Sequence, residues 1–504
     1  MALRSLRGVF GATPAGRLCR NIRVRCYSRV SAKNRLQLNR ITKPPGTVHP
    51  LSPNDLVRWF EDACNAGPQL IGTEHEKFAV ARDADGAIVP VNYEEHVRPM
   101  LRSLVEEHGW EVGDDRGIHG EVVALRRDNA SVTLEPGGQL ELSGAPLGTI
   151  AETCEEFRAH QFELDAVART HGVTLLAAGF HPFARRDEIR WMPKGRYAVM
   201  RDYLPTRGAR ALDMMTRTAT VQANFDYRSE VDCGRRLRVS AALTPALVSM
   251  FANSPYEEGK FQDTISRRSS VWEDVDPDRC GLVDVLFDGD FSFDRYALWA
   301  LEIPMFFVKR QGDYIPHHAP FSAYIEDGLR LPDGTTTHAT EADWQLHLNT
   351  LFPEARLNPF IELRSPDSVP HELICALPAF AKGLLYDDDA CAETWDLLGG
   401  PSLDQRREAW SRARTAGLRD DALHRECAAL LDISARGLKR IAAAEGRAHD
   451  EGSFLDPLRR SVDARRSPAH DALEALGEQP GNSAAGRAAL CQHYYYAGAS
   501  IEDA

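Results

Sequence analysis

Hydrophobic and polar residues alternate along several short segments of the chain, and this period of two predicts β-strands. The segment "IGTEHEKFAV" belongs to a predicted strand over 70–80, and "VTLLAAGFHP" predicts another, apolar strand. Residues 124–147 predict a strand, a tight turn and a second strand, because two adjacent glycines interrupt the alternation. Further strands are expected over 218–227 and 356–370.

Apolar residues spaced three or four positions apart predict helices elsewhere in the chain. "NDLVRWFEDAC" has this spacing, a long helix over 149–172 ends at Gly172, and most of 371–475 has a helical pattern. Strands and helices do not alternate regularly, so a doubly wound sheet is not favoured. The pattern predicts an α+β fold: a mainly antiparallel sheet surrounded by helices, with a helical C-terminal part.

Three predicted strands carry glutamates inside apolar runs. In "GTEHEKF", Glu74 and Glu76 share one face of the strand, because strand side chains alternate between faces. "TLEPGGQLELS" contains Glu135 and Glu141, and "FIELRSP" contains Glu362 with Arg364 on the same face. Like charges on one face repel each other unless water or a cation separates them.

Five carboxylates converging on one face of a sheet would make an oxygen-only site, which suits Mg²⁺ or Mn²⁺. Zinc is less favoured, because His75 points to the opposite face from its neighbours Glu74 and Glu76. A solvated strand face is the alternative for any single glutamate. The same pattern in three strands favours the metal interpretation.

Two loops are rich in cations, a composition that suits recognition of phosphate or carboxylate groups. "WMPKGRYAVMRDYLP" (191–205) and "SPYEEGKFQDTISRRSSVW" (254–272) supply Lys194, Arg196, Arg201, Lys260, Arg267 and Arg268. A solvated charged loop is the alternative for each segment alone. The glycine-rich signatures of P-loop and Rossmann nucleotide sites are absent from the sequence.

Charge is unevenly distributed along the 504 residues, whose formal net charge is −13. The first acidic residue is Asp55, and the preceding segment contains eleven Lys or Arg, a composition typical of an organelle transit peptide. A disordered basic arm is the alternative. We expect a transit peptide over 1–48, a single catalytic domain over 49–475 and a loose tail over 476–504.

Composition narrows the class of protein further. Hydrophobic residues make up 43% and charged residues 26% of the chain, which is typical of a globular protein. The net negative charge does not favour a nucleic-acid surface, and no apolar run is long enough to predict a membrane-spanning helix. The ten cysteines form no C-x-x-C motif or zinc signature, so reduced, buried thiols are the default expectation.

Seven sequence blocks together resemble one known family, the plant-type glutamate–cysteine ligases. The blocks are "IGTEHEKF", "LEPGGQLELSGAPL", "MPKGRYAVMRDYLP", "DMMTRTATVQANFDY", "SPYEEGKF", "FPEARLNPFIELRSPD" and "CALPAFAKGLLYDDDA". They occur in the family's order over roughly residues 50 to 460. The resemblance implies a glutamine-synthetase-like fold with a funnel-shaped antiparallel sheet. It also implies synthesis of γ-glutamylcysteine from glutamate, cysteine and ATP with Mg²⁺ (or Mn²⁺), the first step of glutathione biosynthesis.

The resemblance also implies roles for individual residues. Metal ions would be held by Glu74, Glu76, Glu135, Glu141, Gln222 and Glu362. Arg364 would face the transferring phosphate, and Arg268 would grip the α-carboxylate of glutamate. Nucleotide phosphates or substrate anions would meet Lys194, Arg196 and Lys260. The cysteine pocket would be formed by Met214, Thr216 and Tyr324. Thr218 and Trp272 would line the substrates, although ordinary packing is the favoured interpretation for these two.

Cys154 and Cys375 match the positions of a long-range regulatory disulfide in the plant enzymes, and two free buried thiols are the alternative. The segment that corresponds to a second plant disulfide contains no cysteine here. The family allows a monomer or a redox-dependent homodimer, and the leader fits a mitochondrion or a chloroplast. Two other functions stay open: a related carboxylate–amine ligase with a different amine or acid, and a non-catalytic binding protein.

Overall fold

The computed structural model describes residues 51–400 and 402–496. Internal contacts divide the chain into two units: Met1–Asp62 with Ser292–Thr350, and Ala63–Phe291 with Leu351–Ala504. The segment expected to form one catalytic domain, 49–475, is therefore divided between two compact units. The predicted transit peptide lies outside the described residues.

In its described part, residues 51–62 and 292–350, the smaller unit combines four helices with two short hairpins. Its elements are α2 (Pro53–Glu61), α10 (Phe293–Leu301), β12 (Phe307–Arg310), β13 (Asp313–Pro316), α11 (Phe321–Asp327), β14 (Leu329–Arg330), β15 (Thr336–Thr337) and α12 (Glu341–Leu348). Aromatic residues form its core: the ring of Phe60 lies 5.6 Å from that of Phe293 and 5.8 Å from that of Tyr296. The predicted amphipathic helix at "NDLVRWFEDAC" is therefore confirmed as α2.

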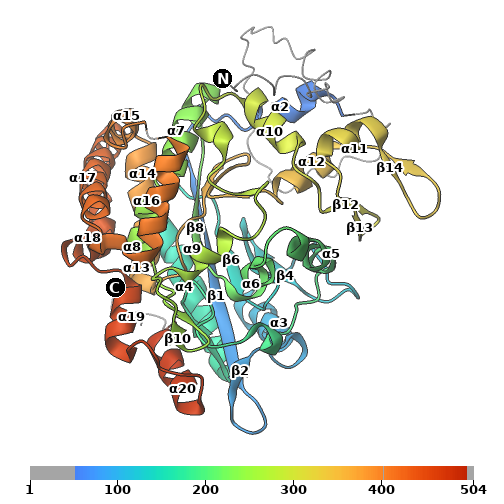
Figure 1. Ribbon diagram of the computed structural model, residues 1–504, viewed down its shortest axis with the longest axis vertical. Helices are drawn as coiled ribbons and strands as arrows, with labels where there is room; N and C mark the ends of the chain where they lie inside the picture. Colours follow the sequence, from blue (N-terminus) through green and yellow to red (C-terminus); the bar gives the residue numbers. More distant parts are fainter. Residues whose placement is uncertain (1–50, 401, 497–504) are drawn as a thin grey trace, which may run out of the picture. The chain divides into compact units, whose positions relative to one another are not determined.

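The larger unit is built on a ten-stranded sheet whose named strand pairs are all antiparallel. The main path runs β17-β18-β8-β1-β6-β5-β4-β3, and β2 and β7 both pair with β1. The strands are β1 (Ile71–Arg82), β2 (Ile88–Pro90), β3 (Glu111–Val112), β4 (Ala124–Arg127), β5 (Ala130–Leu134), β6 (Leu140–Ser143), β7 (Val173–Leu176), β8 (Val221–Phe225), β17 (Ala355–Leu357) and β18 (Ile361–Leu363). Figure 1 shows β1 as the long blue strand in the middle of the unit.

β1 changes its partners halfway along its length. Residues from Ile71 to Lys77 pair with β8 and β6, whereas residues from Phe78 to Arg82 pair with β7 and β2. In the first half the odd-numbered residues are buried and the even-numbered ones are partly exposed. This is the alternation that the sequence predicted, with one face packed and the other left for polar side chains.

The larger unit contains fifteen named helices in its described part, some of which pack on the sheet. They are α3 (Arg98–His108), α4 (Ile150–Thr170), α5 (Gly195–Tyr203), α6 (Ala211–Arg217), α7 (Glu230–Ala242), α8 (Thr244–Phe251), α9 (Arg267–Trp272), α13 (His371–Ile374), α14 (Ala376–Leu385), α15 (Asp388–Leu397), α16 (Leu403–Thr415), α17 (Asp421–Ala444), α18 (Asp456–Asp463), α19 (Pro468–Leu476) and α20 (Ala484–His493). Among them, α4 contacts β1 and α14 contacts β8. The ring of Phe157 on α4 meets the ring of His75 edge-on at 5.4 Å.

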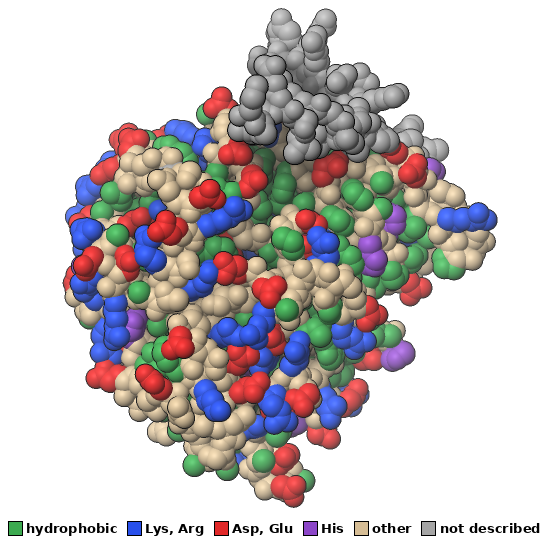
Figure 2. Space-filling view, in the orientation of Figure 1, with side chains coloured by type: hydrophobic (Ala, Val, Ile, Leu, Met, Phe, Trp, Pro, Cys, Tyr) green, Lys and Arg blue, Asp and Glu red, His purple; other side chains and the backbone are tan. Residues whose placement is uncertain are grey.

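The helical pattern predicted over 371–475 is confirmed by α13 to α19. In Figure 1 the orange helices α14, α16 and α17 run together on the left of the view, and α14 packs on α17. Figure 2 shows acidic and basic side chains interspersed on the face in view, and ion pairs such as Arg440–Asp387 at 2.6 Å link neighbouring helices. Such exposed pairs contribute little stability each, so the packed helix faces hold this part together.

Short two-stranded pairs complete the larger unit: β9 (Tyr256–Glu257) with β10 (Lys260–Phe261), and β11 (Cys280–Gly281) with β16 (Phe352–Pro353). Across the described part of the chain, no helix has the length and apolar character needed to cross a membrane.

The segment after α19 differs from the loose tail expected over 476–504. Residues 484–493 form α20, and Leu490 and Cys491 join a buried core that includes Phe78 of β1. Tyr494 and Tyr496 are also buried. The expectation was wrong for this segment because the small and polar residues "EQPGNSAAG" hid the apolar helix face that follows them. Residues 497–504 lie outside the described part.

Candidate active site

The exposed face of the sheet brings together the glutamates that the sequence singled out. Glu74 is paired across the ladder with Gln222 on β8, and Glu76 with Glu141 on β6. Glu362 on β18 is paired with Asn224. Residues directly opposite each other in an antiparallel pair share a face, with Cβ atoms roughly 4.5–5.5 Å apart. The convergence on one face is therefore confirmed, whereas the metal-binding role of these residues stays a prediction.

Neighbouring groups fix the orientation of three of these carboxylates. The side-chain amide of Asn224 donates a hydrogen bond to Oε1 of Glu74 at 3.0 Å. The backbone N–H of Thr220 donates to Oε2 of Glu76 at 3.0 Å. The hydroxyl of Thr133, which faces Glu141 across β5 and β6, donates to Oε2 of Glu141 at 2.5 Å. Each carboxylate keeps a second oxygen that is not used in these contacts.

Glu135 lies on the turn that follows β5. Its backbone N–H donates to the carbonyl of Gln139 at 2.9 Å, and Gly138 has a φ of +86°, which favours glycine. A Cβ on Gly137 would lie 2.4 Å from the carbonyl oxygen of Thr216, so only glycine allows this close approach. The side chain of Gln139 then ties the turn to α6, donating to the carbonyl of Thr218 at 2.8 Å. The "PGG" sequence therefore positions Glu135 beside the end of α6.

Burial and mutual repulsion raise the pKa values of three of these carboxyl groups. The pKa of Glu74 rises to about 8, first through burial and then through the charges of Glu362 and Glu141. Burial and the charges of Glu135 and Glu141 hold the pKa of Glu76 well above its ordinary value. Burial and Glu141 also raise the pKa of Glu135. The cations of the protein therefore do not fully compensate the negative charge of Glu74, Glu76 and Glu135.

Glu362 is compensated by two arginines. Burial alone would raise the pKa of its carboxyl group, but Arg356 and Arg364 outweigh burial and lower that pKa. Arg356 binds both carboxylate oxygens, with Nε–Oε2 and Nη2–Oε1 distances of 2.5 and 2.9 Å. Arg364 donates from Nη1 to Oε2 of Glu362 at 3.1 Å and to Oε1 of Gln222 at 3.0 Å. Two predicted metal ligands, Glu362 and Gln222, therefore hold Arg364 in this structure.

Arg356 is a site residue that the sequence interpretation missed. It lies opposite Glu362 because β17 and β18 form a hairpin with Arg356 and Glu362 in register. The pattern was available: the five residues "LNPFI" separate an arginine and a glutamate six positions apart, and such positions face each other across a tight hairpin.

The set of donors fits Mg²⁺ or Mn²⁺, because it consists of carboxylate and amide oxygens. Buried oxygen atoms remain for a cation: Oδ1 of Asn224 has no hydrogen-bond partner in the described part of the protein. Within residues 51–400 and 402–496, no three Asp, Glu, His or Cys side chains stand close enough together to hold a metal ion as they are now placed. Metal binding would therefore require side-chain movement, and Glu362 would have to loosen its contacts with the arginines.

Cations line the Glu135 side of the cluster. Lys194 precedes α5 and is buried, and burial followed by the charge of Arg196 lowers its pKa to about 8, although Glu135 acts in the opposite direction. Tyr197 ties the start of α5 to the end of β5 by donating to the carbonyl of Leu134 at 2.5 Å. The structure thus places both predicted phosphate-binding cations of this loop next to Glu135.

Arg268 on α9 is buried behind the end of β18. Its Nη1 and Nη2 donate to the carbonyls of Ser365 and Arg364 at 3.0 and 2.8 Å, and only its Nε lacks a partner among the described residues. These two bonds use two of the five N–H groups of the guanidinium, and the carboxylate-binding role expected from the sequence stays a prediction. Arg268 fixes the backbone at Arg364, and the ring of Trp272 lies beneath both guanidinium groups at 5.8 and 6.0 Å.

The remaining predicted site residues do not all lie near the carboxylates. Met214 and Thr216 are buried on α6, next to the turn that carries Glu135, and the hydroxyl of Thr216 already donates to the carbonyl of Leu212 at 2.8 Å. Lys260 is exposed on the hairpin of β9 and β10, whose backbone bonds to the segment at Glu478 and Gly481. The structure therefore does not place Lys260 with the carboxylates.

Tyr324 belongs to the smaller unit and is fully buried there. Its hydroxyl accepts a hydrogen bond from Arg310 at 2.6 Å, and Arg310 binds both oxygens of Asp343 at 2.7 Å. Burial, followed by the charge of Asp343, raises the pKa of Tyr324 to about 12. These contacts give Tyr324 a packing role within its own unit.

Comparison with known proteins identifies the family of this chain. The profile of the glutamate-cysteine ligase family 2 matches residues 70–493. The chain belongs to this family. It is therefore an enzyme of the ligase class. The matched span contains all five glutamates singled out above and both cation-rich segments, 191–205 and 254–272.

Curated relatives of this glutamate–cysteine ligase family member include the chloroplastic glutamate–cysteine ligases of Brassica juncea and Arabidopsis thaliana. Each is 37% identical to it over 443 residues, covering 86% of this chain and 83% or 82% of the relative. Among solved structures, the glutamate–cysteine ligase of Francisella tularensis in complex with AMP aligns with a TM-score of 0.50 at 14% identity, covering 87% of this chain and 91% of that one. This likeness confirms the predicted fold class.

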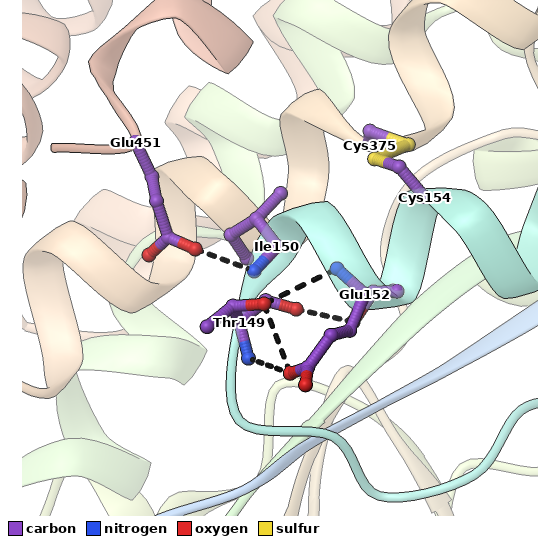
Figure 3. Close-up of a disulfide and its surroundings, with 7 residues drawn as sticks. Thr149, Ile150, Glu152, Cys154, Cys375 and Glu451 are labelled. Carbon is purple, nitrogen blue, oxygen red and sulfur yellow. Dashed lines mark hydrogen bonds between the residues drawn. A yellow bond between two sulfur atoms is a disulfide. The ribbon is translucent and has the colours of Figure 1, made fainter. Parts of the chain in front are cut away.

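The structure of this family member contains a disulfide between Cys154 on α4 and Cys375 at the start of α14, residues 221 positions apart in the sequence. In Figure 3 Glu451 points at the start of α4, where its Oε1 accepts from the backbone N–H of Ile150 at 2.6 Å. The other oxygen of Glu451 binds Nζ of Lys382 on α14 at 2.6 Å. Glu451 therefore bridges the two helices that the disulfide joins: it accepts from the backbone of α4 and forms a buried ion pair with Lys382 on α14.

A cavity of about 600 Å³ lies at the opposite end of β1 from the carboxylates, lined by Arg82, Arg169, His171 and Cys491 among others. Arg169 already pairs with Asp165 at 2.5 Å. This cavity contains none of the carboxylates singled out above.

Proposed function

We propose that the protein is an ATP- and Mg²⁺-dependent glutamate–cysteine ligase. It would join the γ-carboxylate of L-glutamate to the amine of L-cysteine through a γ-glutamyl phosphate, the first step of glutathione biosynthesis. The observation that supports this most strongly is the family match over residues 70–493, which includes a face where Glu74, Glu76 and Glu141 converge beside Arg364.

The reaction explains why such a face is needed. A carboxylate is a poor electrophile, because its negative charge repels the attacking amine. Transfer of a phosphoryl group from ATP to the γ-carboxylate creates a good leaving group, which the amine then displaces. The protein must bring several anions together and stabilise the charge of the transferring phosphoryl group.

The residues of the site would divide this work. Lys194 and Arg196, beside Glu135, would bind phosphate oxygens, and Arg364 would turn from Glu362 and Gln222 towards the transferring group. Glu74, Glu76, Glu135 and Glu141 would hold divalent metal, with Gln222 and Glu362 joining when Arg364 moves. Bound Mg²⁺ would supply positive charge to the phosphates. Arg268 would hold the backbone of Arg364 and offer its Nε to the substrate carboxylate.

An assay for γ-glutamylcysteine tests the proposal. Purified protein is incubated with glutamate, cysteine, ATP and Mg²⁺, and product and phosphate are quantified. We expect stoichiometric product and phosphate, loss of at least about a hundredfold in rate for Glu76→Ala, and near-normal rate for Glu111→Ala, a control on exposed Glu111 at the far edge of the same sheet. Absence of product in the wild-type protein, or equal rates in both variants, would contradict the proposal.

A related carboxylate–amine ligase with another amine or acid is the second candidate, because the acyl-phosphate chemistry depends on the carboxylate face and not on the amine pocket. A panel of amines in the same assay separates the two. A preference of at least tenfold for cysteine supports the first proposal, whereas equal or greater phosphate release with another amine supports the second.

We also propose that residues 1–48 direct the protein to a plastid, because the curated relatives named above are chloroplastic and the leader is basic and acid-free. Import of a fluorescent fusion of this segment tests this; delivery to mitochondria would contradict it. Size-exclusion chromatography with and without reductant tests the expected monomer or redox-dependent homodimer.

A further inference from the structure

The back face of β1 carries a chain of hydrogen bonds directly behind the catalytic glutamates. His75 lies between Glu74 and Glu76 but points to the opposite face, and its ring is almost completely buried. Its Nδ1 lies 3.1 Å from the hydroxyl of Tyr496, and its Nε2 lies 3.4 Å from the hydroxyl of Ser368. Both ring nitrogens therefore face a hydroxyl group.

The direction of each bond follows from the proton of Ser368. The Ser368 hydroxyl donates to the backbone carbonyl of Glu76 at 2.7 Å, so it has no second proton for His75. His75 must then donate from Nε2–H to Ser368, which leaves Nδ1 as an acceptor for the hydroxyl of Tyr496. The chain runs from Tyr496 through His75 and Ser368 to the carbonyl of Glu76.

This chain ends at a point where the strand needs support. Pairing of β1 with β8 ends at His75 and pairing with β7 begins at Phe78, so the ladder on this side of β1 is incomplete at Glu76. The N–H of Glu76 still donates to the carbonyl of Thr220, the residue before β8, at 3.0 Å, but the N–H of Thr220 donates to Oε2 of Glu76 and not to its carbonyl. That carbonyl accepts from Ser368 instead, so a side chain completes the hydrogen bonding of the Glu76 backbone.

The segment after α20 delivers Tyr496 to this place. The N–H of Ala177 donates to the carbonyl of Tyr494, and the N–H of Tyr496 donates to the carbonyl of Leu175, both at 2.9 Å, so the segment runs along the end of β7. Phe157 and Nζ of Lys77 pack on the ring of Tyr496 at 6.2 and 5.5 Å. The family match ends at 493, so Tyr496 lies outside the region that the match covers.

We propose that Tyr496 and Ser368 are positioning residues for divalent-metal binding, because they hold Glu76 in place through His75 and its backbone carbonyl. The proposal rests on the proposed function in one respect only, the assignment of Glu76 as a metal ligand. Hydrogen bonds in series polarise one another, so losing the first link weakens the last. The segment after α20 thereby contributes to the site without touching substrate.

Titration of the intact protein with Mn²⁺, followed by electron paramagnetic resonance, tests the proposal without measuring activity. Tyr496→Phe removes the first donor and keeps the ring, and Ser368→Ala removes the last. We expect each variant to bind Mn²⁺ about fivefold to tenfold more weakly than the wild type. This factor corresponds to the net free energy of one hydrogen bond, if its loss is transmitted in full to the metal affinity. The double variant should be no weaker than Ser368→Ala alone, because the links act in series.

Tyr256→Phe is the matched control. Tyr256 is another buried tyrosine of this unit; its hydroxyl donates to the carbonyl of Gly477 at 2.6 Å and also lies 3.0 Å from the carbonyl of Ala472, and neither contact involves His75. It should lower the melting temperature but leave Mn²⁺ affinity within twofold of wild type. Unchanged Mn²⁺ affinity in Tyr496→Phe and Ser368→Ala, or an equal loss in Tyr256→Phe, would overturn the proposal.

Absence of Mn²⁺ binding in the wild-type protein would remove the metal assignment itself, and the ligase assay then shows whether the proposed function survives. Where Ser368→Ala does not fold, Tyr496→Phe decides alone, because it removes a single oxygen atom and leaves the aromatic packing intact.

Discussion

Replacing Arg356 by glutamine should destabilise the larger unit and slow the ligase. Arg356 contributes two of the hydrogen bonds that hold the buried carboxylate of Glu362, and Arg364 contributes a third. Breaking a buried ion pair by removing one partner costs about 3–5 kcal/mol. Since Arg364 stays as a partner, we expect roughly 2–3 kcal/mol for Arg356→Gln.

The expected change in melting temperature follows from the size of the unit. A unit of about 380 residues, at an unfolding entropy near 2.1 cal/mol/K per residue, gives roughly 0.8 kcal/mol/K. A loss of 2–3 kcal/mol therefore lowers the melting temperature by about 3 °C, which differential scanning fluorimetry resolves. Turnover should fall at least about tenfold, because Arg364 becomes the sole counter-charge of Glu362 and turns less readily to phosphate.

A double-mutant cycle with Glu362→Gln isolates the pair. Combining both substitutions removes both charges, so the double variant should be at least about 1 kcal/mol more stable than additivity predicts. Arg356→Lys should recover part of the stability, because it keeps the charge but loses the planar fork. Additive effects, or a fall of less than about 1 °C in Arg356→Gln, would refute the assignment of Arg356 as the main partner of Glu362.

Three further predictions follow from the site and its surroundings. Mg²⁺–ATP should raise the melting temperature of the wild-type protein by several degrees, and Glu76→Ala should blunt that rise; an unchanged shift in the variant would contradict the metal assignment. Burial, then Arg217, lowers the pKa of His181 to about 3, so the unfolded chain takes up a proton below about pH 6.5 while the folded protein does not. Stability should therefore fall as the pH falls, by about 2 kcal/mol at pH 5, and His181→Asn should show a shallower decline between pH 7 and pH 5. Reductant should lower the melting temperature of the wild-type protein but not that of Cys154→Ser, since only the former has a cross-link that constrains its unfolded state.

Strand alternation was enough to place the glutamates, because a side-chain period of two leaves no freedom once a strand is assigned. Glu74 and Glu76 occupy the partly exposed face of β1, and His75 is buried behind them, as the pattern predicts. Which strands lie next to β1 could not be derived in this way, since β6 and β8 reach it from distant parts of the sequence. The register that pairs Glu76 with Glu141 is a tertiary result.

The partners of the charged side chains were harder to predict than the sheet face on which each side chain lies. Arg268 looked like a carboxylate-binding arginine, yet its two terminal nitrogens bind backbone carbonyls. Lys260 shared a cation-rich segment with Arg268, but a hairpin carries it to the surface. Local composition shows that cations are available, whereas the path of the backbone decides which anion each cation meets. Arg356 was missed because residues 356–370 were taken as a single strand, whereas β17 and β18 form a hairpin that puts Arg356 opposite Glu362.

The two faces of β1 explain how one strand can carry repelling carboxylates and stay folded. On the back face Ile71 is fully buried, and burial of such an aliphatic side chain contributes roughly 1.5–3 kcal/mol. That burial offsets the repulsion that raises the pKa values of Glu74 and Glu76 on the other face. A site that is destabilised by its own charge needs a rigid support, since a flexible strand would relieve the repulsion by moving the carboxylates apart. The hydrogen bonds from Tyr496 and Ser368 behind Glu76 would meet this requirement, because they reach the strand where its ladder with β8 ends.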